Sequence, residues 1–129
     1  MSVEGVSISA IVRIKGISWK TAARWLERAA GAARRFNDIM TRDYDLLEIQ
    51  ADEIRTFVGC KSRSTWIITS MEAWSRLWTS TVLGRRSYRN INRLLQDMSR
   101  RGRFDYMPLI TTDGFYYYGV VISRLFKHV

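Results

Sequence analysis

The order of apolar runs in the second half of the sequence constrains the fold more than any other feature. Residues 46–58, 65–71 and 77–83 are rich in β-branched and aromatic side chains, which favour strands. The first run alternates, and Leu47, Ile49 and Ala51 are predicted to share one face of the strand. Because only short connections separate the three runs, we expect an antiparallel meander.

A helix, one more strand and a second helix follow the meander. Ser87 can cap a helix that extends to about Ser99 and has one apolar stripe, made of Ile91, Leu94, Leu95 and Met98. Residues 108–112 have the pattern of a fourth short strand, and residues 115–126 that of a helix. One side of that helix would carry Phe115, Tyr118, Gly119, Ile122 and Phe126. A right-handed crossover makes the fourth strand a parallel neighbour of the first, so the predicted fold class is α+β.

The N-terminal part of the chain has helical patterns instead. Ser7 or Ser9 can cap a short helix that carries Ile8, Ile11 and Val12 on one side. Gly16 interrupts this helix, and Ser18 can cap a second one over residues 19–30. Two helices joined by a tight turn at glycine form the helix-turn-helix arrangement, in which the second helix enters the major groove of DNA.

The second helix of this pair has two different faces. Apolar residues recur at helical spacing on one face, at Ala22, Trp25, Leu26 and Ala29. Basic residues recur at four-residue intervals on another, and the residues expected to face DNA are Lys20, Thr21, Arg24 and Arg28. A small helical hairpin with a solvated basic face would have the same spacing, and this alternative stays open.

A change of composition marks the expected domain boundary. Residues 31–42 have the pattern of a connecting helix, whose packing residues would be Phe36, Ile39 and Met40. Residues 43–53 hold five acids and no base, in a chain that is otherwise rich in arginine. The sequence therefore predicts a DNA-binding segment with its connecting helix over residues 1–42 and a second domain over residues 43–129.

The charge of the chain indicates a polyanionic partner. Its 129 residues include 21 Lys and Arg against 12 Asp and Glu, and 17 of the basic residues are arginine, which suits paired contacts to phosphate. The densest cluster surrounds a single acid, Asp97, and consists of Arg85, Arg86, Arg89, Arg93, Arg100, Arg101 and Arg103. Such density predicts phosphate contacts, although a solvated helix face would have the same composition.

Composition also excludes several kinds of site. One cysteine, Cys60, and one histidine, His128, cannot supply the four ligands of a structural zinc ion. Cys60 is expected to be a small buried residue. No run approaches the roughly 18 apolar residues of a membrane span, so a soluble protein is expected. The aromatic residues expected in the core or an interface are Trp66, Trp74, Trp78 and Tyr116 to Tyr118.

Two acids stand out by their context. Asp52 lies in the middle of an apolar strand, and Asp113 ends another strand just before Gly114. If the first and fourth strands are parallel neighbours, the two carboxylates converge at one edge of the sheet and could bind a divalent cation. Alternatively, Asp52 pairs with an arginine and Asp113 is a turn residue. Periodicity alone does not choose between Asp52 and the adjacent Glu53.

Four segments resemble, in their order, the bacterial insertion-sequence transposases of the insertion sequence one type. They are ISAIVRIKGISWKTAARWLERA, LEIQADEIRTFVG, WIITSM with TSTVLGRRS, and PLITTDGFYYY, and they span nearly the whole chain. The resemblance implies a helix-turn-helix followed by an RNase H-like catalytic domain of the Asp-Asp-Glu class. Asp52 matches the first catalytic acid of that class and Asp113 the second, and both would hold Mg²⁺ or Mn²⁺.

The implied reaction is nicking at the ends of the element, followed by attack of the freed 3′-hydroxyl on target DNA. However, no Asp or Glu follows Asp113, so the third acid of the class has no counterpart. The zinc-binding segment that precedes the helix-turn-helix in many relatives is also missing. We therefore expect a partial RNase H-like domain in a transposase that is truncated at both ends.

The resemblance further implies double-stranded DNA as the partner, both element ends and target, together with self-association and no membrane. The expected location is the cytoplasm of a bacterium or archaeon, in association with the nucleoid. A non-catalytic DNA-binding repressor of transposition, derived from such an element, is the main alternative, and a protein-interaction fold with a solubilising charge is another. Whether the chain is an enzyme stays open between these interpretations.

Overall fold

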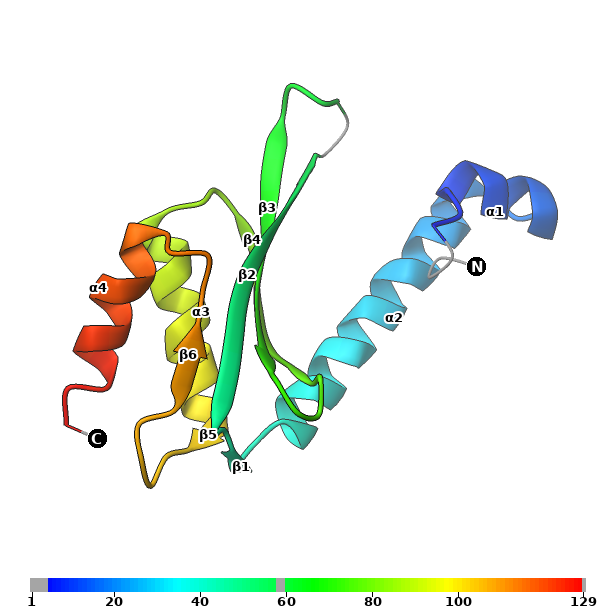
Figure 1. Ribbon diagram of the computed structural model, residues 1–129. Coiled ribbons are helices and arrows are strands. Elements are labelled where there is room, and N and C mark those ends of the chain that lie inside the picture. The colour runs from blue at the N-terminus through cyan, green and yellow to red at the C-terminus, as the bar shows by residue number, and fades with distance from the viewer. Residues whose placement is uncertain (1–4, 58–59, 129) are drawn as a thin grey trace. The chain divides into compact units, whose positions relative to one another are not determined.

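The computed structural model describes residues 5–57 and 60–128, and the chain divides into two compact units, Met1–Met40 and Thr41–Val129 (Figure 1). This division falls two residues before the predicted boundary. Val58 and Gly59, which end the first predicted strand and belong to one of the transposase-like segments, lie outside the described residues.

The first unit begins with a short helix that ends at a glycine. α1 (Ile8–Lys15) starts after Ser7, whose Oγ accepts a hydrogen bond from the N–H of Ala10 at 3.2 Å. The helix ends at Gly16, whose φ of 63° is left-handed and would strain a residue with a Cβ atom. Both ends of the first predicted helix are therefore confirmed.

The second helix of this unit is longer than the sequence predicts. α2 (Trp19–Met40) begins after Ser18, whose Oγ accepts a hydrogen bond from the N–H of Thr21 at 3.1 Å, as expected for its cap. The predicted separation of a helix over 19–30 from a connecting helix is wrong. α2 is one continuous helix of 22 residues that includes Gly31. A helical glycine costs only about 1 kcal/mol relative to alanine, and the flanking alanines favour helix.

A four-stranded sheet forms the centre of the second unit. In spatial order its strands are β4 (Trp78–Gly84), β3 (Ser64–Glu72), β2 (Glu48–Phe57) and β6 (Leu109–Thr111). β3 is antiparallel to both β2 and β4, whereas β6 is parallel to β2. The α+β class is confirmed, and so is the predicted arrangement of a meander with its fourth strand parallel to the first.

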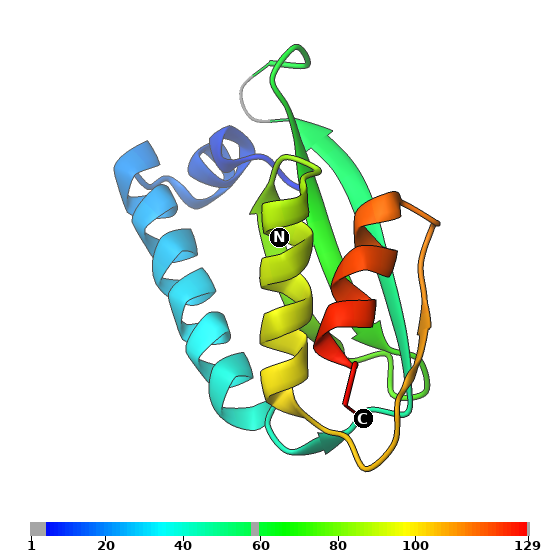
Figure 2. The same cartoon turned by 90° about the vertical axis from the view of Figure 1, so that its left-hand side faces the viewer.

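Two helices cover one face of this sheet (Figure 2). α3 (Tyr88–Arg101) connects β4 to the strands that follow, and α4 (Tyr116–Leu125) comes after β6. All four residues of the predicted apolar stripe of α3 are buried in the core: Ile91, Leu94, Leu95 and Met98. None of the helices in the described part of the chain is long and apolar enough to cross a membrane.

A small second sheet changes the start of the first predicted strand. β1 (Tyr44–Asp45) pairs in parallel with β5 (Gly102–Arg103), and neither strand was predicted. β2 begins only after this pairing, so Leu46 is buried in the core and Leu47 is 68 % exposed. The prediction that Leu47 shares a face with Ile49 and Ala51 is therefore wrong, because those two residues are buried and Leu47 is not.

Several aromatic residues also lie outside the core. Trp74 is 81 % exposed, Tyr116 is 74 % exposed and Trp78 is about half exposed, so these three lie outside the core and their expected place at an interface stays a prediction. Trp66 packs against the core, and Tyr118 is fully buried in it. Four of the five residues predicted on one side of the last helix lie in or against the core, and they are Phe115, Tyr118, Ile122 and Phe126. The fifth, Gly119, is exposed, and Val121 is buried.

A buried carboxylate holds the turn between β3 and β4. Glu72 is 6 % exposed; its Oε1 accepts the N–H of Trp74 at 3.1 Å, and its Oε2 accepts the N–H and the hydroxyl of Ser75, both at 2.6 Å. Burial disfavours the charged carboxylate, but the hydrogen bonds outweigh it and lower the pKa of Glu72 below its ordinary value of 4.5.

This lowered pKa predicts acid sensitivity of the second unit. A depressed carboxyl pKa adds stability above the ordinary value of 4.5, and the gain is lost as the pH falls through the folded-state pKa. We expect Glu72→Gln to cost about 1–3 kcal/mol at neutral pH and to flatten the loss of stability on acidification. Urea unfolding at about pH 7 and pH 3 measures this. Glu48→Gln is the control, and an equal effect of both variants contradicts the role of Glu72.

Candidate functional site

Two acids that are 61 positions apart in the sequence lie at one pocket. β6 pairs with β2 in parallel, with Gln50 opposite Thr111. Because the two strands run in the same direction, the register continued by two residues brings Asp52 level with Asp113. Both acids line a pocket of about 290 Å³. Both residues therefore lie at the pairing of β2 with β6, as the sequence predicts, while the convergence of their carboxylates on one cation stays a prediction.

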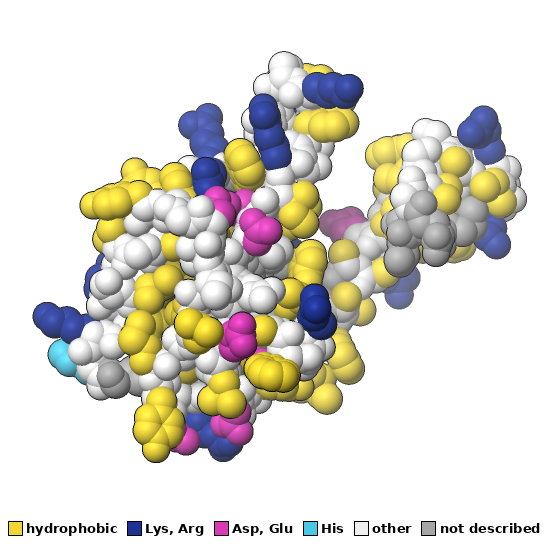
Figure 3. All heavy atoms as spheres, in the orientation of Figure 1, with side chains coloured by type: hydrophobic (Ala, Val, Ile, Leu, Met, Phe, Trp, Pro, Cys, Tyr) yellow, Lys and Arg dark blue, Asp and Glu magenta, His cyan; other side chains and the backbone are white. Residues whose placement is uncertain are grey.

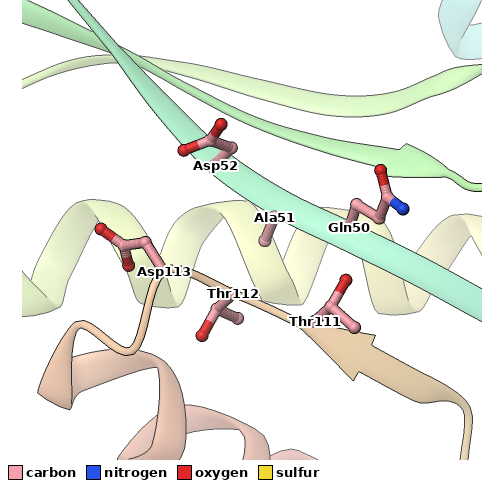
Figure 4. Close-up of a pocket in the computed structure, with 6 residues that line it drawn as sticks. All are labelled: Gln50, Ala51, Asp52, Thr111, Thr112 and Asp113. Carbon is pink, nitrogen blue, oxygen red and sulfur yellow. The ribbon is translucent and has the colours of Figure 1, made fainter.

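The pocket is rich in oxygen donors. Figure 4 shows its lining residues, from β2 and from the segment that begins in β6: Gln50, Ala51, Asp52, Thr111, Thr112 and Asp113. Gln50 and Thr111 were not among the predicted site residues. Each lies two positions before one of the acids, and alternation would have placed it beside that acid. Carboxylate, amide and hydroxyl oxygens are the ligands that hard divalent cations take.

Asp52 is exposed on the sheet face opposite the core. Its neighbour Ala51 is buried in the core, so alternation along β2 turns Asp52 the other way. Its Oδ1 accepts a hydrogen bond from the N–H of Glu53 at 2.7 Å. Within residues 5–57 and 60–128, no arginine or lysine forms an ion pair with it. The alternative in which Asp52 pairs with an arginine is therefore wrong.

Asp113 lies in the turn between β6 and α4. Its Oδ1 accepts a hydrogen bond from the N–H of Phe115 at 2.9 Å, across Gly114, whose φ is 82°. This is the turn role expected of aspartate before glycine. Its Oδ2 forms an ion pair with Nη2 of Arg86. Asp113 is therefore oriented by two donors of the chain, and each oxygen keeps a second lone pair.

The buried carboxylate of β2 is Glu53, which the sequence could not distinguish from Asp52. Its side chain is only 2 % exposed, and its Oε2 lies 3.2 Å from Nη2 of Arg86, so one nitrogen contacts both Glu53 and Asp113. The guanidinium stacks on Phe115, 3.8 Å from the ring centroid, and lies 5.6 Å from that of Trp66. Arg86 thus links the buried face of β2 to an acid of the pocket.

Ionisation around Arg86 follows from this burial. Burial opposes its charge, but the hydrogen bond to Glu53 and the charges of Glu53 and Asp113 prevail, so the pKa of Arg86 is raised. Burial, together with the negative charge of Glu53, also raises the pKa of Tyr118. The buried atoms Oε1 of Glu53, Nε of Arg86 and the hydroxyl of Tyr118 have no hydrogen-bond partner. In the part of the chain that the structure describes, this cluster contains the buried side-chain nitrogen and oxygen atoms that lack a hydrogen-bond partner.

The predicted metal ligands form a pair and not a larger cluster. Among the described residues, no group of three or more His, Cys, Asp and Glu side chains could hold a metal ion. Asp52 and Asp113 could contribute one carboxylate each to a single hard cation, with further oxygens from Gln50 and the threonines of the pocket. The donor set therefore suits one divalent cation better than two.

The predicted arginine cluster divides into two groups. Three members form ion pairs within the chain: Arg86 with Glu53 and Asp113, Arg101 with Asp97, and Arg103 with Asp45. The other four are exposed and form no ion pair in the part of the chain that the structure describes: Arg85, Arg89, Arg93 and Arg100. Figure 3 shows Lys and Arg side chains at separate places on one face, with hydrophobic side chains between them.

The basic residues of α2 are accessible to a partner. Lys20, Arg24 and Arg28 are exposed and follow one another at four-residue intervals on the helix. Thr21 is less accessible, and its hydroxyl lies 2.9 Å from Oγ of Ser18 within the helix cap. The first three residues are therefore accessible to a partner, and DNA contact by them stays a prediction, whereas the hydroxyl of Thr21 is engaged at the start of α2.

Cys60 is exposed, so the prediction of a small buried residue is wrong. Its Sγ lies 3.0 Å from Oγ of Ser62, and this hydrogen bond is the main cause of a lowered thiol pKa.

The chain matches no family model and no curated protein. Its function must be inferred from the acid pocket and the exposed basic residues.

Glu53 is buried and the adjacent Asp52 is exposed, so replacing each acid by its amide should change the stability of the protein by a different amount. Glu53→Gln leaves Arg86 partly unneutralised, and we expect a loss of about 1–3 kcal/mol. This is less than for a fully buried pair, because Arg86 is 30 % exposed and keeps Asp113. Asp52→Asn should change stability by no more than about 0.5 kcal/mol, because Asp52 is exposed. Urea unfolding of both variants tests this, and similar losses for the two would refute the assignment of Glu53 as the buried acid.

Proposed function

We propose that this chain is a DNA-binding protein of the insertion-sequence transposase type, with an RNase H-like second unit that binds a divalent cation between Asp52 and Asp113. The observation that carries the proposal is the shared pocket of these two acids at the β2–β6 pair. A transposase-like role would place the protein with DNA in the cytoplasm of a bacterium or archaeon.

The topology of the second unit supports this proposal. An antiparallel meander, a helix and a fourth strand parallel to the first are the elements expected of an RNase H-like core. An acid in the middle of the first strand and one just after the fourth then line one pocket. A likeness of fold does not establish an activity, and the two carboxylates carry that part of the proposal.

The residues of the pocket fit one hard cation. Asp52 has an exposed carboxylate with no cationic partner among the described residues, and Asp113 is held in place by Arg86 and the N–H of Phe115. When bound, such a cation would polarise a phosphodiester and favour ionisation of an attacking hydroxyl. The chain itself would contribute by fixing the two carboxylates and by binding the DNA backbone through arginine.

The non-catalytic repressor is a second candidate, and one contact favours it. Arg86 neutralises much of the charge of Asp113, and no third acid joins the pair within the described residues. A protein with this pocket could bind DNA at the ends of an element without cutting it. The two candidates share DNA binding and differ in whether Asp52 and Asp113 bind a cation.

Calorimetric titration with Mg²⁺ or Mn²⁺ tests the pocket. We expect the wild-type chain to bind the ion, and Asp52→Asn and Asp113→Asn each to weaken binding about tenfold or more, because each removes one of two charged ligands. Asp105→Asn, an exposed acid outside the pocket, is the control and should bind like the wild type. Absence of binding, or equal loss in all three variants, would favour the repressor.

The helix-turn-helix part of the proposal is tested at Arg24. We expect Arg24→Ala to weaken binding to a preferred DNA site by about 1–3 kcal/mol, because its exposed side chain would contact a base edge. Arg13→Ala removes the same charge from α1 and serves as the control. Fluorescence anisotropy with a preferred and an unrelated duplex measures both variants. Equal losses on the two duplexes would indicate backbone contact and contradict base recognition by Arg24.

A further inference from the structure

The arginines of α3 that have no ion pair lie on one side of the helix. At about 100° per residue, Arg89, Arg93 and Arg100 fall within an arc of about 40°. The buried residues of α3 lie on the opposite side and pack into the core. α3 therefore carries a row of exposed guanidinium groups on the side opposite its buried residues.

Two of these arginines line a pocket that the acid site does not include. Arg93 and Arg100 are two turns apart, and with Gln96 they border a cavity of about 290 Å³ between α3 and β4. The strand contributes three neighbouring residues to its lining, namely Ser80, Thr81 and Val82. Drug-sized ligands need about 300–1,000 Å³, so the cavity suits a small group such as one phosphate.

The one acid of this pocket is already neutralised. Oδ2 of Asp97 accepts a hydrogen bond from the hydroxyl of Ser80 at 2.6 Å and one from Nε of Arg101 at 2.9 Å. Its Oδ1 lies 3.3 Å from Nη2 of Arg101. The charge of Asp97 is thus balanced by Arg101, and the charges of Arg93 and Arg100 remain available to an anion.

We propose that the α3–β4 pocket binds a phosphate group of a DNA backbone, with Arg93 and Arg100 as its charged ligands and Thr81 and Gln96 as neutral donors. This inference rests on the proposed DNA binding but not on the cation pocket. β4 and β6 are opposite edges of the four-stranded sheet, so the phosphate site and the cation pocket are separate contacts.

The salt dependence of duplex binding tests this site. Each phosphate contact to duplex DNA contributes about 0.9 to the slope of log affinity against log salt. We expect the double variant Arg93→Gln, Arg100→Gln to reduce the slope by about 0.9, because one phosphate contact is lost. At about 0.1 M salt its affinity should fall about eightfold, the factor that this slope change produces over one decade of salt. Circular dichroism should show unchanged folding, because both side chains are exposed and form no ion pair.

Arg103→Gln provides the matched control. It removes a charge from an arginine of the same cluster that is exposed but already paired with Asp45. We expect its salt slope to match that of the wild type. An unchanged slope in the double variant, or an equal loss per charge in Arg103→Gln, overturns the phosphate site while DNA binding stands. Wild-type affinity that does not depend on salt overturns the proposed DNA binding itself.

Amide chemical shifts distinguish a backbone phosphate from a free one. We expect duplex DNA to shift the amides of Thr81 and Gln96 in the wild type and not in the double variant. We expect inorganic phosphate to shift the same amides only at millimolar concentration, because it lacks the neighbouring contacts of a duplex. Tight binding of inorganic phosphate that DNA does not displace, or DNA binding without shifts at these amides, overturns the proposal.

Discussion

The parallel pairing of β6 with β2 is the interaction on which the candidate site depends. It joins segments about sixty positions apart in the sequence, and only three residue pairs form it. β6 can reach β2 because α3 crosses the sheet and buries its apolar stripe on the way. The two strands run in the same direction, so residues beyond the last pair stay level. Asp52 and Asp113 lie two residues beyond the last pair, and both line the pocket.

Much of this arrangement follows from local sequence patterns. Alternation and β-branched residues predicted the meander, and the spacing of Ile91, Leu94, Leu95 and Met98 predicted the buried side of α3. The continuation of α2 through Gly31 could not be predicted, because a single glycine weakens a helix without ending it. Leu47 does not share the buried face of Ile49 and Ala51, because the unpredicted β1–β5 pair delays the start of β2. Contacts between distant segments decide where an element begins and which residues it buries, and the local sequence pattern does not predict these contacts.

The adjacent acids of β2 illustrate the same limit at the site. Alternation requires Asp52 and Glu53 to point to opposite faces, yet it does not say which face is covered. The helices settle this, because Glu53 lies on their side and is buried against Arg86. Neither the Glu53–Arg86 contact nor the stacking of Arg86 on Phe115 has a local sequence signal. Ion pairs of this kind also separate the arginine cluster into paired and unpaired members. A guanidinium that is paired with an acid of its own chain adds little net positive charge for an anionic partner.

Each unit carries exposed basic residues, and the second unit also has a pocket lined by two acids. The proposed cation site next to bound DNA needs both kinds of charge. Paramagnetic broadening of amide resonances during a titration with Mn²⁺ locates the cation most directly. We predict that amides of residues 50–52 and 111–113 broaden first and together, because both segments line the same pocket. Early broadening at other acids, such as those of residues 43–45, or of only one of the two segments, would contradict a cation held between Asp52 and Asp113.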